Sequence, residues 1–296
     1  MDTRATTKLI LTLVIAVGLL LPGARVFAQS GKGGTKTASR ILYHNGQLMI
    51  GTTNLYFIWY GCWTCSFPGS DTGTQNQLTR FAVGIGNSPY ARINTTYSDG
   101  SGRTPSGNFV LGGAVADEYS HGAVLSETDA ADLIVGQFVN GGLPVDPGGV
   151  YVVLLSSDVY IEGLTEGRCQ YHRAVDVNGS MIKHAVIANP QRAPTLCAPQ
   201  FVDSDGSLLP TPNDDLAFDA MASWLAHVLN GSVTNPTGLG WYDRYGLENS
   251  DKCQGTFGQT YFTPNGARAN MIIQGMDVLI QQNWVNDGRG YCGLAW

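Results

Sequence analysis

The chain has 296 residues, a formal net charge of −6 at pH 7 and only 14% charged residues. Its length suits one sizeable domain. No cluster of basic residues occurs, which argues against nucleic acid or an anionic membrane surface as a partner. The 38 glycines and the low charge are typical of an extracellular, loop-rich protein.

Residues 1–28 have the pattern of a secretory signal peptide. Two basic residues precede the apolar run Leu9–Leu21, and Ala28 ends a site with small residues at the −3 and −1 positions. The run has about 13 residues, fewer than the roughly 20 that span a bilayer. We therefore expect a secreted, extracellular protein with no stable membrane span after cleavage. The polar, glycine-rich residues 29–40 are expected to form a flexible leader.

Six cysteines follow the signal segment, and an even number in an oxidising compartment predicts three disulfides. Six cysteines allow 15 pairings, among which the sequence alone does not choose. On order and proximity to expected elements we prefer Cys62–Cys65, Cys169–Cys197 and Cys253–Cys292. Cys62 and Cys65 have CxxC spacing, but they follow an expected strand and precede a turn, so a structural bond is favoured over a redox role.

The clearest elements alternate along the chain. The apolar segments Thr53–Tyr60 and Val150–Ile161 predict buried strands. Between them Ser126 begins an expected helix as its N-cap, so a parallel pairing of the two strands is expected. Residues 219–231 predict a second helix, and apolar residues spaced three and four apart predict a third within 263–280. The simplest interpretation is one α+β domain with a central mixed β-sheet and flanking helices.

His227 lies on the expected helix 219–231 and is the first candidate metal ligand. A zincin site has a helical histidine, a second ligand four residues later and an acid from a later loop. Here Gly231 stands at the second ligand position, and Val228 stands where a zinc hydrolase has its catalytic glutamate. A histidine packed in the core is the alternative interpretation.

Other candidate ligands come from loops and strand ends. Glu248 and Asp251 could supply the acid of a zincin-like arrangement, or form a solvated acidic turn. With Asp243 they also suggest weak calcium binding, although their spacing does not fit an EF-hand. His172 follows a strand, where sites are often built, but it is also close to Cys169. We expect no cofactor, with zinc or calcium as the alternatives.

Aromatic residues suggest a carbohydrate ligand as a further option. Trp63, Trp241 and Tyr242 lie near expected strand ends and loops, where flat rings could stack on sugars. Aromatic side chains also bury large areas in protein cores. Ligand binding by these three residues is therefore a hypothesis beside an ordinary packing role.

Several segments together resemble the exordium, or phosphate-induced protein, family of secreted plant proteins and their bacterial relatives. The segments carrying the resemblance are Thr53–Gly61, Tyr119-Ser120-His121-Gly122, Val150–Gly163, Arg168-Cys169 with His172, Thr234-Asn235-Pro236, and Glu248 with Asp251 and Cys253. The resemblance implies an exordium-like domain over residues 41–296 and a cell-wall or extracellular setting. Some relatives look as if they carry His-Glu at the helix, from which this chain departs at Val228 and Gly231.

Two functions follow as expectations. The favoured one is a secreted, non-catalytic protein that binds an extracellular or cell-wall component, with carbohydrate as one candidate. The alternative is a metal-dependent hydrolase with a degenerate zincin-like site at His227, Glu248, Asp251 and His172.

Overall fold

The computed structural model describes residues 39–296. The expected signal peptide, residues 1–28, and all but the last two residues of the expected leader, 29–40, lie outside this range. None of the helices within residues 39–296 is long and apolar enough to cross a membrane.

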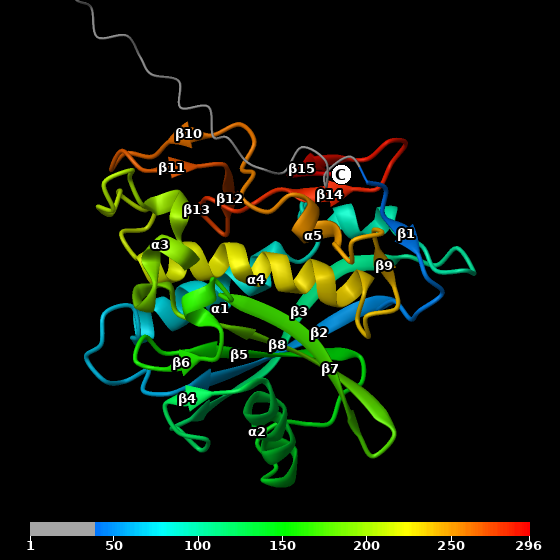
Figure 1. Cartoon of the computed structure of the whole chain (residues 1–296), viewed down its shortest axis with the longest axis horizontal. Coiled ribbons are helices and arrows are strands. Elements are labelled where there is room, and N and C mark those ends of the chain that lie inside the picture. Colours follow the sequence, from blue (N-terminus) through cyan, green and yellow to red (C-terminus); the bar gives the residue numbers. More distant parts are fainter. Residues whose placement is uncertain (1–38) are drawn as a thin grey trace, which may run out of the picture. The chain divides into compact units, whose positions relative to one another are not determined.

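A mixed sheet of five strands forms the centre of the domain (Figure 1). The strand order is β3-β2-β5-β8-β7, in which β7 is antiparallel to β8 and the other neighbours are parallel. The strands are β2 (Gly51–Tyr60), β3 (Pro105–Asp117), β5 (Gly149–Leu155), β7 (Gln170–Val177) and β8 (Ser180–Ile187). This arrangement confirms the expected α+β domain with a central mixed sheet.

The two long apolar segments form adjacent central strands. β2 and β5 pair in parallel, with Leu55 opposite Val150 and Tyr60 opposite Leu155. All of β5, and β2 from Leu55 onward, is buried. Such strands need apolar residues on both faces because helices or loops cover both sides of the sheet.

Helices cover the sheet from opposite sides. They are α1 (Thr72–Ile85), α2 (Glu127–Val139), α3 (Pro194–Cys197), α4 (Leu216–Thr234) and α5 (Asn249–Lys252). α1 and α4 pack with Leu55 and Phe57 in one core, whereas α2 packs with Tyr56 and Ile58 in the other. Figure 1 shows α2 on the side of the sheet away from α1 and α4.

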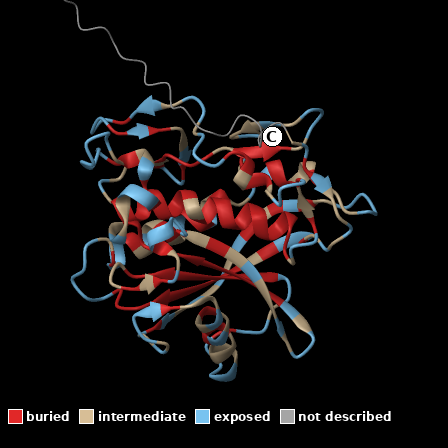
Figure 2. Cartoon of the chain, viewed as in Figure 1, coloured by how far each residue is buried: buried red, intermediate tan, exposed pale blue. Residues whose placement is uncertain are grey.

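Helix α4 is buried along nearly its whole length (Figure 2). Asp215 caps its first turn by accepting a hydrogen bond from the Phe218 backbone N–H at 3.1 Å. Apart from Trp224, every residue of the helix is buried. The reason is that the segment after β13 (Met276–Val278) covers part of α4: Leu279 packs with Leu216 and Ala220, and Gln281 contacts Ser223 and His227. His227 therefore lies inside the protein.

Short elements complete the domain over residues 39–296. Two-stranded pairs are formed by β1 (Leu42–Tyr43) with β9 (Trp241–Tyr242), β4 (Val124–Leu125) with β6 (Tyr160–Ile161), β10 (Tyr261–Phe262) with β11 (Arg268–Ala269), β12 (Met271–Ile273) with β13 (Met276–Val278), and β14 (Asn283–Val285) with β15 (Tyr291–Gly293). The 3₁₀ helices are η1 (Ala91–Thr96), η2 (Leu164–Glu166), η3 (Pro190–Arg192) and η4 (Pro199–Phe201).

The expected helix within residues 263–280 is wrong. This segment forms β11, β12 and β13 instead. Gln274 and Gly275 both have positive φ, 51° and 74°, and turn the chain between β12 and β13. Two successive residues of positive φ define the tight turn that suits a hairpin. The apolar spacing therefore reflects two short strands whose buried side chains join the core that contains α1 and α4.

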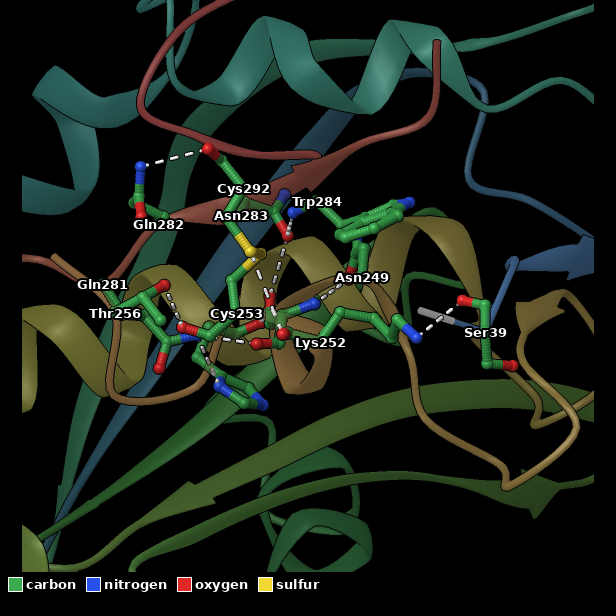
Figure 3. The surroundings of a disulfide bond; sticks show 12 residues. Ser39, Asn249, Lys252, Cys253, Thr256, Gln281, Gln282, Asn283, Trp284 and Cys292 are labelled. Atoms are coloured by element: carbon green, nitrogen blue, oxygen red, sulfur yellow. Dashed lines mark hydrogen bonds between the residues drawn. A yellow bond between two sulfur atoms is a disulfide. The ribbon is translucent and has the colours of Figure 1, made fainter. Parts of the chain in front are cut away.

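The three disulfides have the preferred pairing, Cys62–Cys65, Cys169–Cys197 and Cys253–Cys292. Among residues 39–296 no cysteine is free. Figure 3 shows the third bond, which joins the end of α5 to β15. The bond therefore fixes the C-terminal hairpin against the loop that carries Glu248 and Asp251.

Candidate functional site

The four candidate ligands form two histidine–carboxylate pairs at the side of α4. His172 Nε2 lies 2.7 Å from Glu248 Oε2, and His227 Nε2 lies 3.2 Å from Asp251 Oδ1. The side chains of His172, Glu248 and His227 are at most 15% exposed, and that of Asp251 is 30% exposed. The fold thus brings residues from β7, α4 and the α5 loop into two pairs.

The first pair is an ion pair held by a helix end. Glu248 Oε1 accepts a hydrogen bond from Asn235 Nδ2 at 2.6 Å. Asn235 follows the last residue of α4, and its Oδ1 accepts the Gly240 backbone N–H. Burial lowers the pKa of His172, but the charge of Glu248 and their hydrogen bond raise it more, so the net shift is upward. When His172 is protonated, its charge neutralises that of Glu248.

Glu248→Gln is expected to lower the pKa of His172, because burial then acts without the opposing negative charge. A group with a raised pKa stabilises the fold fully below its unfolded value, about 6.5 for histidine, and this stability is lost as the pH rises through the folded value. NMR titration of the His172 ring measures the shift. Glu118→Gln removes the charge of an exposed glutamate that follows β3, at the opposite edge of the sheet from β7, and should leave His172 unchanged. An unaltered titration in Glu248→Gln would contradict the assignment.

The second pair fixes the tautomer of His227. Gln281 Nε2 lies 3.0 Å from His227 Nδ1 and also donates to the Ser250 carbonyl oxygen at 3.1 Å. A carbonyl oxygen can only accept a hydrogen bond, so the Gln281 atom that contacts the Ser250 carbonyl is the amide nitrogen. The same nitrogen donates to His227, and Nδ1 therefore accepts this hydrogen bond. The ring proton of neutral His227 then resides on Nε2 and points at Asp251.

Asp251 is engaged on both carboxylate oxygens. Its Oδ1 faces His227, and its Oδ2 accepts the Glu248 backbone N–H at 3.0 Å, which starts the short helix α5. Burial raises the pKa of Asp251, but its hydrogen bonds with His227 and the Glu248 backbone N–H oppose this, and the net shift is downward. The carboxylate therefore orients α5 and His227 together.

This arrangement does not fit a zinc site. A zinc-bound histidine usually gives a ring nitrogen to the metal and donates its other N–H to an oxygen. In His227 one nitrogen receives a donor from Gln281 and the other carries the proton toward Asp251. Within residues 39–296 no group of three or more histidine, cysteine, aspartate or glutamate residues is placed to hold a metal ion.

Asp243, one of the three carboxylates of the suggested calcium site, pairs with Lys252 instead. The side chain of Asp243 is fully buried and lies 3.0 Å from the Lys252 ammonium nitrogen. Its other oxygen accepts the backbone N–H groups of Tyr245 and Leu247 at 2.8 and 3.0 Å. Asp243 therefore holds the loop before α5 in place and does not face a shared site with Glu248 and Asp251.

Gly231 leaves the space in which the first pair lies. A Cβ atom on Gly231 would be 2.5 Å from Glu248 Oε2 and 2.7 Å from His172 Nε2. The position of a second helical ligand is thus filled by a histidine from β7 and its acid. Val228, at the position of a catalytic glutamate, is buried in the main core.

The aromatic candidates lie in different surroundings. Trp63 is 3% exposed, and its indole N–H donates to the Leu154 carbonyl oxygen at 3.1 Å, so its ring belongs to the core. Trp241 and Tyr242 are half-buried in β9, where they contact Tyr43 and His44 of the β1 segment. The His44 and Tyr242 rings stack with centroids 3.6 Å apart.

Two residues of the site were not found from the sequence. Gln281 lies just beyond the wrongly expected helix within residues 263–280, so nothing placed it beside His227. Asn235 belongs to an Asn-Pro pair that signals only the end of a helix. Its side chain reaches Glu248 because the chain turns back through residues 236–247 after α4.

Fold and site together define an α+β protein whose helical histidine is held by an acid and an amide. The family model described as "Phosphate-induced protein 1 conserved region" matches residues 41–272. This chain belongs to that family, which confirms the resemblance to exordium proteins.

Curated relatives from plants agree with this assignment. "Protein EXORDIUM-like 3" of Arabidopsis thaliana is 28% identical over 246 residues, covering 76% of this chain and 72% of that protein. "Protein EXORDIUM" of the same plant is 28% identical over 244 residues, covering 73% and 74%. "Protein PHOSPHATE-INDUCED 1" of Nicotiana tabacum is 26% identical over 239 residues, covering 73% and 72%. No solved structure matches the chain.

Proposed function

We propose that this family member is exported and binds a ligand outside the cell without hydrolysing it. The signal-like pattern of residues 1–28 supports export. The three disulfides support it as well, because such bonds persist in oxidising compartments and are rare in the cytosol.

The state of His227 carries the non-catalytic part of the proposal. Metal-assisted hydrolysis needs a ligand nitrogen with a free lone pair and a base beside the bound water. Gln281 donates to one nitrogen of His227, and Asp251 accepts from the other. The neighbouring Val228 side chain is apolar and buried. These contacts favour a structural role for the histidine.

An extracellular or cell-wall component is the proposed partner. Metal-assisted hydrolysis would require the two histidine–carboxylate pairs to separate, because their nitrogen and oxygen atoms would have to bind the metal. Ligand binding can use a surface away from these pairs. A domain with disulfides and a rigid central sheet suits the second role, because preformed walls reduce the ordering cost of binding.

Export is tested by expressing the full chain in a host with a secretory pathway, beside a variant lacking residues 1–28. We expect the full chain in the medium, with no thiol reacting with an alkylating reagent before reduction, and the shortened variant inside the cell. Equal retention of both forms would overturn the export proposal.

The non-catalytic proposal is tested on exported protein purified without an affinity tag. Elemental analysis should find no stoichiometric zinc, and casein incubated with the protein should remain intact. Zinc bound one-to-one and lost in His227→Ala, together with casein cleavage, would instead establish the metal-dependent hydrolase. A second experiment uses Gln281→Glu. Its negative charge beside Nδ1 should favour the tautomer with the proton on Nδ1, which leaves the lone pair of Nε2 for a metal.

A further inference from the structure

A cavity opens at the edge of the sheet where the parallel strands begin. Its volume is about 660 Å³, within the range of small-molecule sites. Its walls come from the segment before β2, the loop before β3 and the turn before β5, with Lys183 of β8. The cavity is separate from the histidine–carboxylate pairs, because none of those four residues lines it.

The first wall of the cavity, residues 43–50, is held rigidly. The Gly46 backbone N–H donates to the Leu239 carbonyl oxygen at 2.7 Å, and Tyr43 Oη donates to the Gly46 carbonyl oxygen at 2.7 Å. A Cβ on Gly46 would lie 2.2 Å from the Leu239 oxygen, so only glycine allows this approach. The half-buried Tyr43 ring also contacts Trp241, with centroids 5.6 Å apart.

The second wall is a turn organised by one carboxylate. Asp99 accepts hydrogen bonds from the backbone N–H groups of Ser101 and Arg103, at 2.8 and 2.9 Å, and from Arg103 Nε at 2.8 Å. These bonds hold both sides of the turn without using the Ser101 hydroxyl. The cavity therefore has preformed walls, which lower the ordering cost of binding.

The charges that line the cavity are already balanced. Arg103 pairs with Asp99 at 2.7 Å. Lys183 Nζ donates to the carbonyl oxygens of Pro147 and Met181, and burial lowers its pKa while the charge of nearby Asp146 acts in the opposite direction. A phosphate or carboxylate ligand would have to compete with Asp99 and Asp146 for these cations. The electrostatics therefore favour a neutral ligand.

Polar side chains remain available on the cavity wall. Asn45, Gln47 and Ser101 are exposed, and within residues 39–296 no hydrogen-bond partner contacts the side chains of these three residues. Each amide offers donors and an acceptor, the combination that matches the hydroxyl groups of a sugar. Leu48 and Ile50 add apolar surface beside the Tyr43 ring.

We propose that this cavity binds a neutral saccharide, with Asn45 and Gln47 recognising hydroxyl groups and Tyr43 contacting the apolar face of a sugar ring. The proposal rests on the extracellular binding function proposed above and gives it a site and a ligand class. It also gives β9 a role, because Trp241 of this strand contacts the Tyr43 ring.

The test compares neutral and acidic oligosaccharides by calorimetry and by NMR shifts of the cavity-lining residues. The probes are cellohexaose and xylohexaose, with hexagalacturonate as the acidic one. The test variant, Asn45→Gly with Gln47→Ala, removes both amides, and glycine tolerates the positive φ of 66° at position 45. We expect a neutral hexamer to bind and the variant to weaken its Kd about tenfold, from two lost hydrogen bonds.

Asn178→Gly is the matched control, because Asn178 also has positive φ, 52°, and does not line the cavity. It should bind as tightly as the unmodified chain. The site is overturned if no neutral hexamer binds at millimolar concentration, if hexagalacturonate binds more tightly, or if the double variant keeps full affinity. These results leave the proposed export and absence of hydrolysis standing, since other measurements test those.

Discussion

Lys252→Met is expected to lower the free energy of unfolding by about 3–5 kcal/mol, the usual cost of removing one partner of a buried ion pair. The side chains of Lys252 and Asp243 are both fully buried, with 3.0 Å between Nζ and Oδ2. Lys252 Nζ also donates to the Ser39 carbonyl oxygen at 2.6 Å and lies 5.3 Å from the centre of the Trp284 ring (Figure 3). Methionine fills a similar volume but leaves the Asp243 charge without its cation. Urea unfolding monitored by tryptophan fluorescence measures the loss.

The double variant Lys252→Met with Asp243→Asn is the matched control. It removes both charges and keeps an oxygen that can accept the backbone N–H groups of Tyr245 and Leu247. It should be more stable than Lys252→Met alone, because most of the cost comes from the unpaired charge. Equal losses in the single and double variants would show that packing, and not charge, sets the effect.

The same pair predicts how the loss depends on pH. Burial raises the pKa of Asp243, but hydrogen bonds from Lys252 and the backbone lower it more. A depressed carboxyl pKa gives stability that is present above the unfolded value, about 3.9, and is lost as the pH falls through the folded value. The difference between the unmodified chain and Lys252→Met should therefore shrink below about pH 4.

Much of the fold could be predicted where one physical signal was strong. The segments of β2 and β5 are apolar on both faces, and only a covered parallel sheet accommodates such strands. Ser126 marked the start of α2, where it accepts the Asp129 backbone N–H at 3.2 Å. Residues 271–278 misled because the apolar residues of two short paired strands can imitate helical spacing. The turn at Gln274 and Gly275 prevents a continuous helix there, because both residues have positive φ.

The candidate site could be predicted in its membership but not in its chemistry. His172, His227, Glu248 and Asp251 form two histidine–carboxylate pairs beside α4. Their pairing depends on which atoms face each other, and this in turn depends on Gln281 of a distant loop. Ring tautomers and pair geometry arise from tertiary contacts, for which residue spacing carries no signal.

Gly231→Ala is expected to lower the free energy of unfolding by about 1–3 kcal/mol, the range for overpacking a filled interior. In an open helix the same change would raise stability by about 1 kcal/mol, because alanine is the better helix former. In α4 the added Cβ would meet Glu248 Oε2 at 2.5 Å and His172 Nε2 at 2.7 Å. Glu248 cannot move freely, because Asn235 holds its other oxygen. The overlap should therefore outweigh the gain in helix propensity.

Gly136→Ala in α2 separates the two effects, because no atom beyond its chain neighbours and the adjacent helix backbone lies within 4 Å of its added Cβ. It should raise stability by about 0.5–1 kcal/mol. In a His172→Ala background Gly231→Ala should lose part of its cost, because the overlap with His172 is gone while the overlap with Glu248 remains. Thermal and urea unfolding of the unmodified chain, of His172→Ala, of Gly231→Ala and of the double variant gives the coupling energy between positions 172 and 231. If Gly231→Ala stabilised the chain as Gly136→Ala does, the space beside α4 would be free for a side chain, and steric overlap would no longer explain the glycine at position 231.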